Sequence, residues 1–112
     1  MQRTFNPMED LERIWARWLL REYTHANLYY RMKLKAPVLE VGDIGAKHGC
    51  WNPLTRVLSI HRNTIRKYPW NEVVDILKHE MAHQWVTDFG SPGEPAHGAE
   101  FKKACEKLGL PD

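Results

Sequence analysis

Residues 79–83, His-Glu-Met-Ala-His, are the part of the chain best suited to chemistry. On a helix with about 3.6 residues per turn, His79 and His83 stand one turn apart on the same face, so two imidazole nitrogens can converge on one ion. Glu80 is rotated by about 100 degrees from His79. That direction suits a carboxylate that contacts metal-bound water and not the metal itself. The motif predicts half of a catalytic zinc site.

Catalytic zinc usually takes three protein ligands and leaves one position open for water, so a third ligand is needed. His97 is the strongest candidate, because a loop rich in Gly and Pro separates it from the motif and can bring it back onto the ion. Glu94 and Glu100 can replace His97 in a site built from two His and one Glu. We rank both carboxylates below it. Ordinary polar or core roles are expected for the other three histidines: His25, His48 and His61.

The motif belongs to a predicted helix that begins near Asn71, its expected cap, and continues to about Asp88. A separate apolar stripe on this helix supplies core packing without the histidines: Val74, Leu77, Met81 and Trp85. The run from residue 90 to residue 95, Gly-Ser-Pro-Gly-Glu-Pro, ends the helix. A last short helix is expected from Gly98 or Ala99 to Gly109, with its inward face formed by Phe101, Cys105 and Leu108.

The first half of the chain predicts a long helix followed by strands. Asn6 and Pro7 form a helix start, and the helix continues to roughly Thr24 or beyond, with a stripe formed by Leu11, Ile14, Trp15, Trp18 and Leu19. Between residues 34 and 60, Gly and Pro separate short runs such as VLEV and RVLSI, which predict strands. A hairpin turns at Asn52 and Pro53. The expected fold class is α+β with about three strands, in a single domain spanning residues 1–112.

Composition narrows the class of protein. Hydrophobic residues make up 43% of the 112 residues, enough to bury a core. Neither an apolar run of membrane-spanning length nor a signal-peptide pattern is present in the sequence. We therefore expect a cytoplasmic monomer without a membrane partner. The two cysteines, Cys50 and Cys105, form no C-x-x-C pair and are expected to be free thiols.

Charge is distributed unevenly along the chain. Residues 1–70 contain 12 of the 16 Lys and Arg residues but only 6 of the 14 Asp and Glu residues. Such a basic half can guide an anionic partner, or it can be a solvated face. Basic residues there alternate with aromatic ones that can stack on unpaired bases: Arg13, Arg17, Arg21, Arg31, Lys33 and Lys35 with Trp15, Trp18, Tyr23, Tyr29 and Tyr30. Trp15 and Trp18 are also candidates for the core.

Two separated motifs carry a resemblance to a known family. The sequence HEMAH is followed, 14 positions after its second histidine, by His97 in a phrase of the form H-G-x-E-F. This combination resembles the SprT-like zinc metalloproteases, the family that includes Spartan-type proteases acting on protein crosslinked to DNA. The stretch before it, VLSIHRNTIRKYPWNEVVDILKHEMAH, is similar to the family's strand, connecting segment, proline and ligand helix. The similarity covers roughly residues 8–110.

The resemblance implies a minimal zincin-like metalloprotease domain. His79, His83 and His97 match the family's zinc ligands, and Glu80 matches its catalytic glutamate. Glu100 and Phe101 match the H-G-x-E-F phrase, for which we expect a structural role. The implied partners are a protein or peptide substrate and DNA, with DNA held by the basic half of the chain. A DNA-linked protein would be associated with the nucleoid or nucleus.

The expected reaction is hydrolysis of a peptide bond, in which zinc activates water and Glu80 takes the proton and passes it to the leaving amine. The substrate is expected to lie extended along an exposed edge of the RVLSIH strand, with loose sequence preference. His61, Arg62 and Tyr68 are all candidates to stabilise the oxyanion, and the sequence does not choose among them. Two alternatives remain: a structural zinc site, and a non-catalytic zinc-stabilised module that binds nucleic acid or protein.

Overall fold

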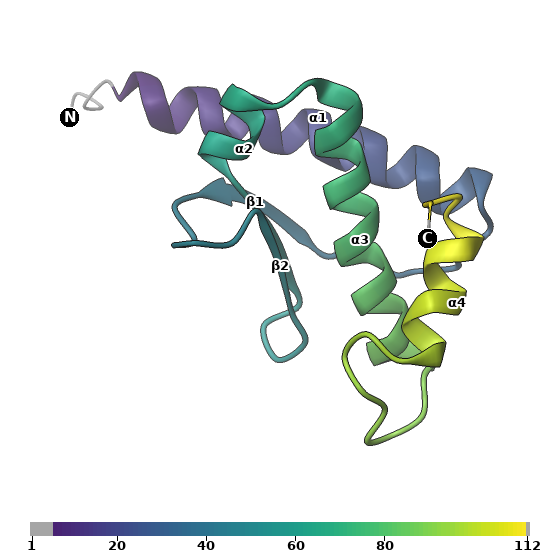
Figure 1. Ribbon diagram of the computed structural model, residues 1–112. Helices are drawn as coiled ribbons and strands as arrows, with labels where there is room; N and C mark the ends of the chain where they lie inside the picture. Colours follow the sequence, from purple (N-terminus) through teal and green to yellow (C-terminus); the bar gives the residue numbers. More distant parts are fainter. Residues whose placement is uncertain (1–5, 112) are drawn as a thin grey trace.

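The structure, a computed structural model, describes residues 6–111 and has the predicted α+β class (Figure 1). Helix α1 lies behind the other elements along most of the length of the molecule, and α3 and α4 lie side by side in front of it. In chain order the elements are α1 (Pro7–Tyr29), β1 (Val38–Gly42), β2 (Gly49–Asn52), β3 (Val57–His61), α2 (Arg62–Lys67), α3 (Trp70–Phe89) and α4 (Ala99–Lys107).

Helix α1 begins as predicted. The Asn6 side chain accepts hydrogen bonds from the backbone N–H groups of Met8 and Glu9, and Pro7 occupies the first turn. Its buried residues are Trp15, Leu19, Tyr23 and Ala26. The predicted stripe was therefore wrong at Leu11 and Trp18, which are 37% and 46% exposed. The core stripe is rotated toward positions 15, 19, 23 and 26, which leaves Trp18 edge-on against Trp70, with ring centroids 6.1 Å apart.

The sheet has the order β1-β3-β2, with β3 parallel to β1 and antiparallel to β2. The predicted hairpin is confirmed: the Asn52 side chain accepts from the N–H groups of Leu54 and Thr55 at the turn. Leu58 and Ile60 face the core. The expectation that a substrate pairs with RVLSIH was wrong, because β3 is the central strand and both of its edges are occupied. The strand that packs against α3 and has an unpaired edge is β2.

Two local features between the sheet and the motif helix differ from the prediction. The short helix α2 connects β3 to α3, and its first N–H groups include that of Asn63, which donates to Nδ1 of His61. Helix α3 begins at Trp70, with extended Pro69 as its cap residue, so the expectation that Asn71 is the cap was wrong. The N–H groups of Glu72 and Val73 donate to the Pro69 carbonyl, which makes the first hydrogen bonds of the helix, and no side chain at Pro69 caps it.

The core lies where α1, α3 and β3 meet. Leu19 of α1, Leu58 of β3 and Leu77 of α3 are all fully buried. On α3 the buried position is Val73, whereas Val74 is half-buried, so the predicted stripe was displaced by one residue at its start. Helix α4 packs on α3 through Phe101, Ala104 and Leu108. Within residues 6–111, no helix has both the length and the apolar character needed to span a membrane.

Candidate metal centre

The three predicted ligand histidines lie together. His79 and His83 project from α3 one turn apart, and His97 comes from the loop between α3 and α4. One ring nitrogen of each can serve as a ligand atom, and these three atoms lie within 4.8 Å of one another. The ring centroids are 5.0 Å apart for His79 and His83, 5.6 Å for His79 and His97, and 5.0 Å for His83 and His97.

Phe101 holds the cluster together from α4. Its ring centroid lies 4.9 Å from that of His79, 4.4 Å from His83 and 4.8 Å from His97. The contact with His83 is stacked. Phe101 is only 6% exposed, so the ring is fixed by the packing of α4 on α3. The aromatic residue of the second motif therefore packs against all three imidazoles.

The two alternative ligands, Glu94 and Glu100, form hydrogen bonds that stabilise the loop carrying His97. The carboxylate of Glu100 accepts from the N–H of Ser91 at 2.7 Å, and the N–H of Glu100 donates to Glu94 at 3.3 Å. Among the described residues, neither carboxylate belongs to the group that could hold an ion. These contacts fix both ends of the loop. They favour His97 as the third ligand.

Burial favours the neutral form of the two imidazoles on α3, His79 and His83. Burial, with smaller contributions from His79 and His97, lowers the pKa of His83 to about 4. Burial and the nearby His97 also lower the pKa of His79. Neutral imidazole is the form that binds zinc. The donor set therefore fits a zinc ion at neutral pH.

Glu80 lies beside this cluster and is 7% exposed. Burial raises its pKa to about 7, while the positive charge of Lys47 and the backbone N–H of Trp51 act in the opposite direction. Strand β2 approaches Glu80 closely because residue 49 is glycine: a Cβ added there would lie 3.1 Å from Cγ of Glu80. A carboxyl group with a pKa near neutrality can both accept and return a proton.

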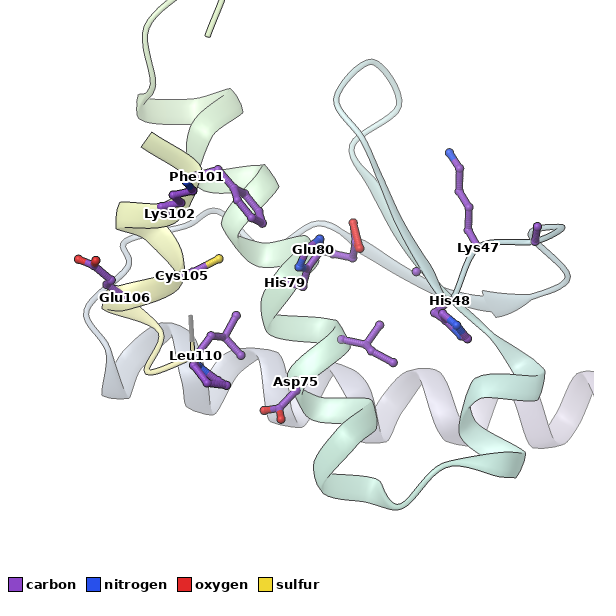
Figure 2. A pocket seen from close by; sticks show the side chains of 14 residues that line it. Lys47, His48, Asp75, His79, Glu80, Phe101, Lys102, Cys105, Glu106 and Leu110 are labelled. Atoms are coloured by element: carbon purple, nitrogen blue, oxygen red, sulfur yellow. The ribbon is translucent and has the colours of Figure 1, made fainter. Parts of the chain in front are cut away.

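An open cleft of about 1080 Å³ leads to Glu80 and His79 (Figure 2). Residues of α3 form its floor, α4 forms one wall, and residues 46–49 at the start of β2 form the other. In Figure 2, Lys47 and His48 lie across the cleft from Phe101 and Lys102. The cleft therefore reaches the histidine cluster at His79.

The three oxyanion candidates from the sequence do not line this cleft. Nε2 of His61 lies 3.4 Å from the carboxylate of Asp43, and Arg62 pairs with Glu12 at 3.1 Å. The ring of Tyr68 packs edge-on against that of His48. His48 itself lines the cleft, which the sequence did not indicate, whereas His25 stacks on Tyr29 of α1.

Gln84 is a positioning residue that sequence reasoning missed. It is fully buried, accepts a hydrogen bond from the hydroxyl of Tyr23 at 2.8 Å and donates to the carbonyl of Lys35 at 2.8 Å. These bonds tie the motif helix to α1 and to the segment before β1. One signal was available, because position 84 continues the buried series Val73, Leu77 and Met81 at helical spacing.

Fold and site together define an α+β domain with three clustered histidines and a buried glutamate, the arrangement of a metalloprotease-like domain. The model of the SprT-like family matches residues 9–111, so the chain belongs to the SprT-like family. The predicted family is therefore confirmed, and membership in it indicates a protease-like domain. Searches of curated proteins and of solved structures gave no match.

Proposed function

We propose that the chain is a zinc-dependent endopeptidase. The observation that carries this proposal is the convergence of three imidazoles, from two separated motifs, beside a buried carboxyl group on the floor of an open cleft. A site with only a structural role has no use for Glu80. Family membership supports the same class of reaction.

In this proposal His79, His83 and His97 hold Zn²⁺ through one ring nitrogen each. When bound, zinc supplies Lewis-acid chemistry, because it lowers the pKa of water and polarises a carbonyl group. Glu80 accepts the proton of the attacking water and delivers it to the leaving amine nitrogen. The N–H of Trp51 holds the carboxylate in place, and the charge of Lys47 favours its ionised form before the proton arrives.

The substrate in this proposal is an extended polypeptide that lies along β2. The unpaired edge of β2 offers backbone hydrogen bonds beside Glu80, and backbone pairing is largely independent of substrate side chains. Gly49 lets this strand approach α3 closely, which places its edge next to Glu80. An unstructured protein segment therefore fits the cleft better than a folded one.

Activity on an unstructured protein, compared between wild type and Glu80→Gln, tests the proposal. We expect the variant to retain one zinc per chain and to lose about 10²- to 10⁴-fold in cleavage rate, the range for general acid–base catalysis. Elemental analysis and gel-based cleavage assays measure the two quantities. Equal cleavage by both proteins would contradict the proposed role of Glu80. A zinc-loaded wild type that cleaves nothing would favour the non-catalytic binding module.

We also propose DNA as a partner of the outward face of α1. Arg17 and Arg21 stand one turn apart on this face, and within residues 6–111 their guanidinium groups form no hydrogen bond or ion pair. Trp18 beside them is 46% exposed and can stack on a base. Trp15 and Tyr23 are buried in the core, so they are not among the aromatic residues that can stack on bases. Cationic side chains next to an exposed aromatic ring suit an unpaired nucleic-acid strand.

A further inference from the structure

We propose that the part of the cleft between α3 and α4 is a subsite for a lysine or arginine side chain of the substrate, with Asp75 as the specificity-determining residue. The inference rests on the proposed peptidase function and adds a substrate class to it. It modifies the expectation of loose sequence preference at one substrate position only. The remaining positions pair through the backbone.

The subsite continues directly from the histidine cluster. Asp75 precedes His79 by four residues on α3, so the two side chains share a face and are about 6 Å apart along the helix axis. On the facing helix, Cys105 follows Phe101 by the same interval, and the ring of Phe101 lies 4.9 Å from that of His79. All four residues line the cleft, and Figure 2 shows them on the two facing helices.

The walls of the subsite are apolar. Phe101 of α4 and Leu110 after α4 line the cleft on the side that faces Asp75, and Ile76 of α3 lines it toward β2. Lysine and arginine place their aliphatic stems along apolar surface while the charged end stays with polar groups. One helical turn is a distance that such a side chain spans when its backbone lies beside His79. Length and wall chemistry therefore both suit these two residues.

The carboxylate of Asp75 is free to pair with a substrate. It is exposed, and within residues 6–111 it forms no hydrogen bond or ion pair. Lys78, the nearest lysine along α3, lies instead over the ring of Tyr30, with Nζ 4.9 Å from the ring centroid and 3.4 Å from its hydroxyl. A substrate cation thus has no internal competitor on this helix.

The cleft has a second acidic side chain besides Asp75. Glu106 of α4 lines the cleft and is also without an ion pair among the described residues. Of the two lysines of the cleft, Lys47 precedes β2 near Glu80, and Lys102 follows Phe101 on α4, one helical turn before Glu106. An acidic substrate side chain would meet repulsion between α3 and α4, and an apolar one would desolvate Asp75 without replacing its hydrogen bonds.

Peptides of one scaffold that carry Lys, Met or Glu at a scanned position test the proposal. We expect wild type to cleave the Lys peptide about tenfold faster, as kcat/KM, than the Glu peptide at one fixed distance from the cleaved bond, the size of a charge-assisted contact open to solvent. Asp75→Asn should remove most of this ratio, and Asp75→Lys should reverse it. Glu72→Gln, an exposed change on the same helix outside the cleft, should leave the ratio unchanged.

Binding of the same peptides to Glu80→Gln, followed by fluorescence anisotropy, tests the subsite without catalysis. The Lys peptide should bind about tenfold more tightly than the Glu peptide, and adding Asp75→Asn should equalise them. Equal binding and equal cleavage of the two peptides by protein with intact Asp75 would overturn the subsite while leaving the peptidase proposal in place. Selective binding without cleavage by wild type would instead overturn the peptidase proposal.

Discussion

At the scale of single residues, burial is the common cause of the chemistry at the site. Removal from water disfavours charge, so it lowers the pKa of His83 to about 4 and raises that of Glu80 to about 7. The first shift keeps His83 neutral, the form that a metal ligand must have. The second supplies a carboxyl group that can exchange a proton near neutral pH. Burial on one helix therefore shifts the two pKa values in opposite directions, because ionised histidine is positively charged and ionised glutamate is negatively charged.

Ionisation of Tyr23 in the unfolded chain is expected to lower the stability of the fold at alkaline pH. Burial raises its pKa from 10.0 to about 12. Below pH 10 the hydroxyl is neutral in the folded and the unfolded chain, so its contribution is fully present. Between pH 10 and 12 only the unfolded chain ionises, so stability falls. We expect the unfolding free energy from urea titrations to drop by about 2 kcal/mol across this window.

The matched comparison is Tyr23→Phe. This variant lacks the hydrogen bond to Gln84 and should be less stable at neutral pH by about 1 kcal/mol or more. Its stability should then decrease less than that of wild type between pH 10 and 12. Parallel curves for the two proteins would show that Tyr23 does not titrate with folding.

At the scale of elements, the glycine at the end of α3 determines how the His97 loop leaves the helix. Gly90 has ordinary backbone angles, so its requirement is steric: a Cβ would overlap the carbonyl of Val86 and the carboxylate of Glu100. We expect Gly90→Ala to cost about 1–3 kcal/mol, as overpacking does. It should also weaken zinc binding, because Glu100 holds Ser91 in the loop.

Thermal unfolding and competition with a chromophoric zinc chelator measure these two effects. Gly42→Ala is the control, since the nearest atom to an added Cβ there is 3.8 Å away. The control should change stability by no more than about 0.5 kcal/mol. Unchanged zinc affinity in Gly90→Ala would contradict the expectation that the contact between Glu100 and Ser91 supports zinc binding.

The elements that local signals specify were predictable. The cap at Asn6, the turn at Asn52 and the closing Gly109, with its positive φ of 70 degrees, all appear as expected. The central position of β3 was not predictable, because it depends on which strands pair across the sheet. The cap of α3 also differed, since the helix begins one residue before Asn71 and has extended Pro69, without a side-chain hydrogen bond, as its cap residue.

The candidate site also combines features that local sequence specifies with features that only the fold provides. The spacing of His79, Glu80 and His83 follows from helix geometry, and His97 followed from a second motif. Gln84 depends on two segments that contact it only in the fold, Tyr23 and the carbonyl of Lys35. The close approach of Gly49 to Glu80 likewise requires the packing of β2 on α3. Sequence therefore indicates the reacting groups better than their supports.

At the scale of the whole molecule, the proposed DNA face and the cleft belong to different sides. Helix α1 packs on α3 and β1 with its buried stripe, so Arg17 and Arg21 point away from the elements that line the cleft. A DNA strand bound to this face of α1 would leave the cleft open to a protein substrate. DNA would then act as a tether for the protease and its substrate.

The salt dependence of DNA binding tests this arrangement. Each phosphate contact contributes about 0.7 to the slope of log affinity against log salt for single strands. We expect Arg17→Gln combined with Arg21→Gln to lower the slope by about 1.4. Anisotropy of a labelled single strand measures it, with Lys103→Gln on α4 as control. Affinity that is indifferent to salt would exclude phosphate contacts.

Zinc content after dialysis, measured by elemental analysis for wild type and for His97→Ala, tests the central claim most directly. We predict one zinc per wild-type chain and little or none in the variant, because two imidazoles from α3 are a much weaker site than three. Wild type without zinc, or a variant that keeps a full equivalent, would contradict this prediction.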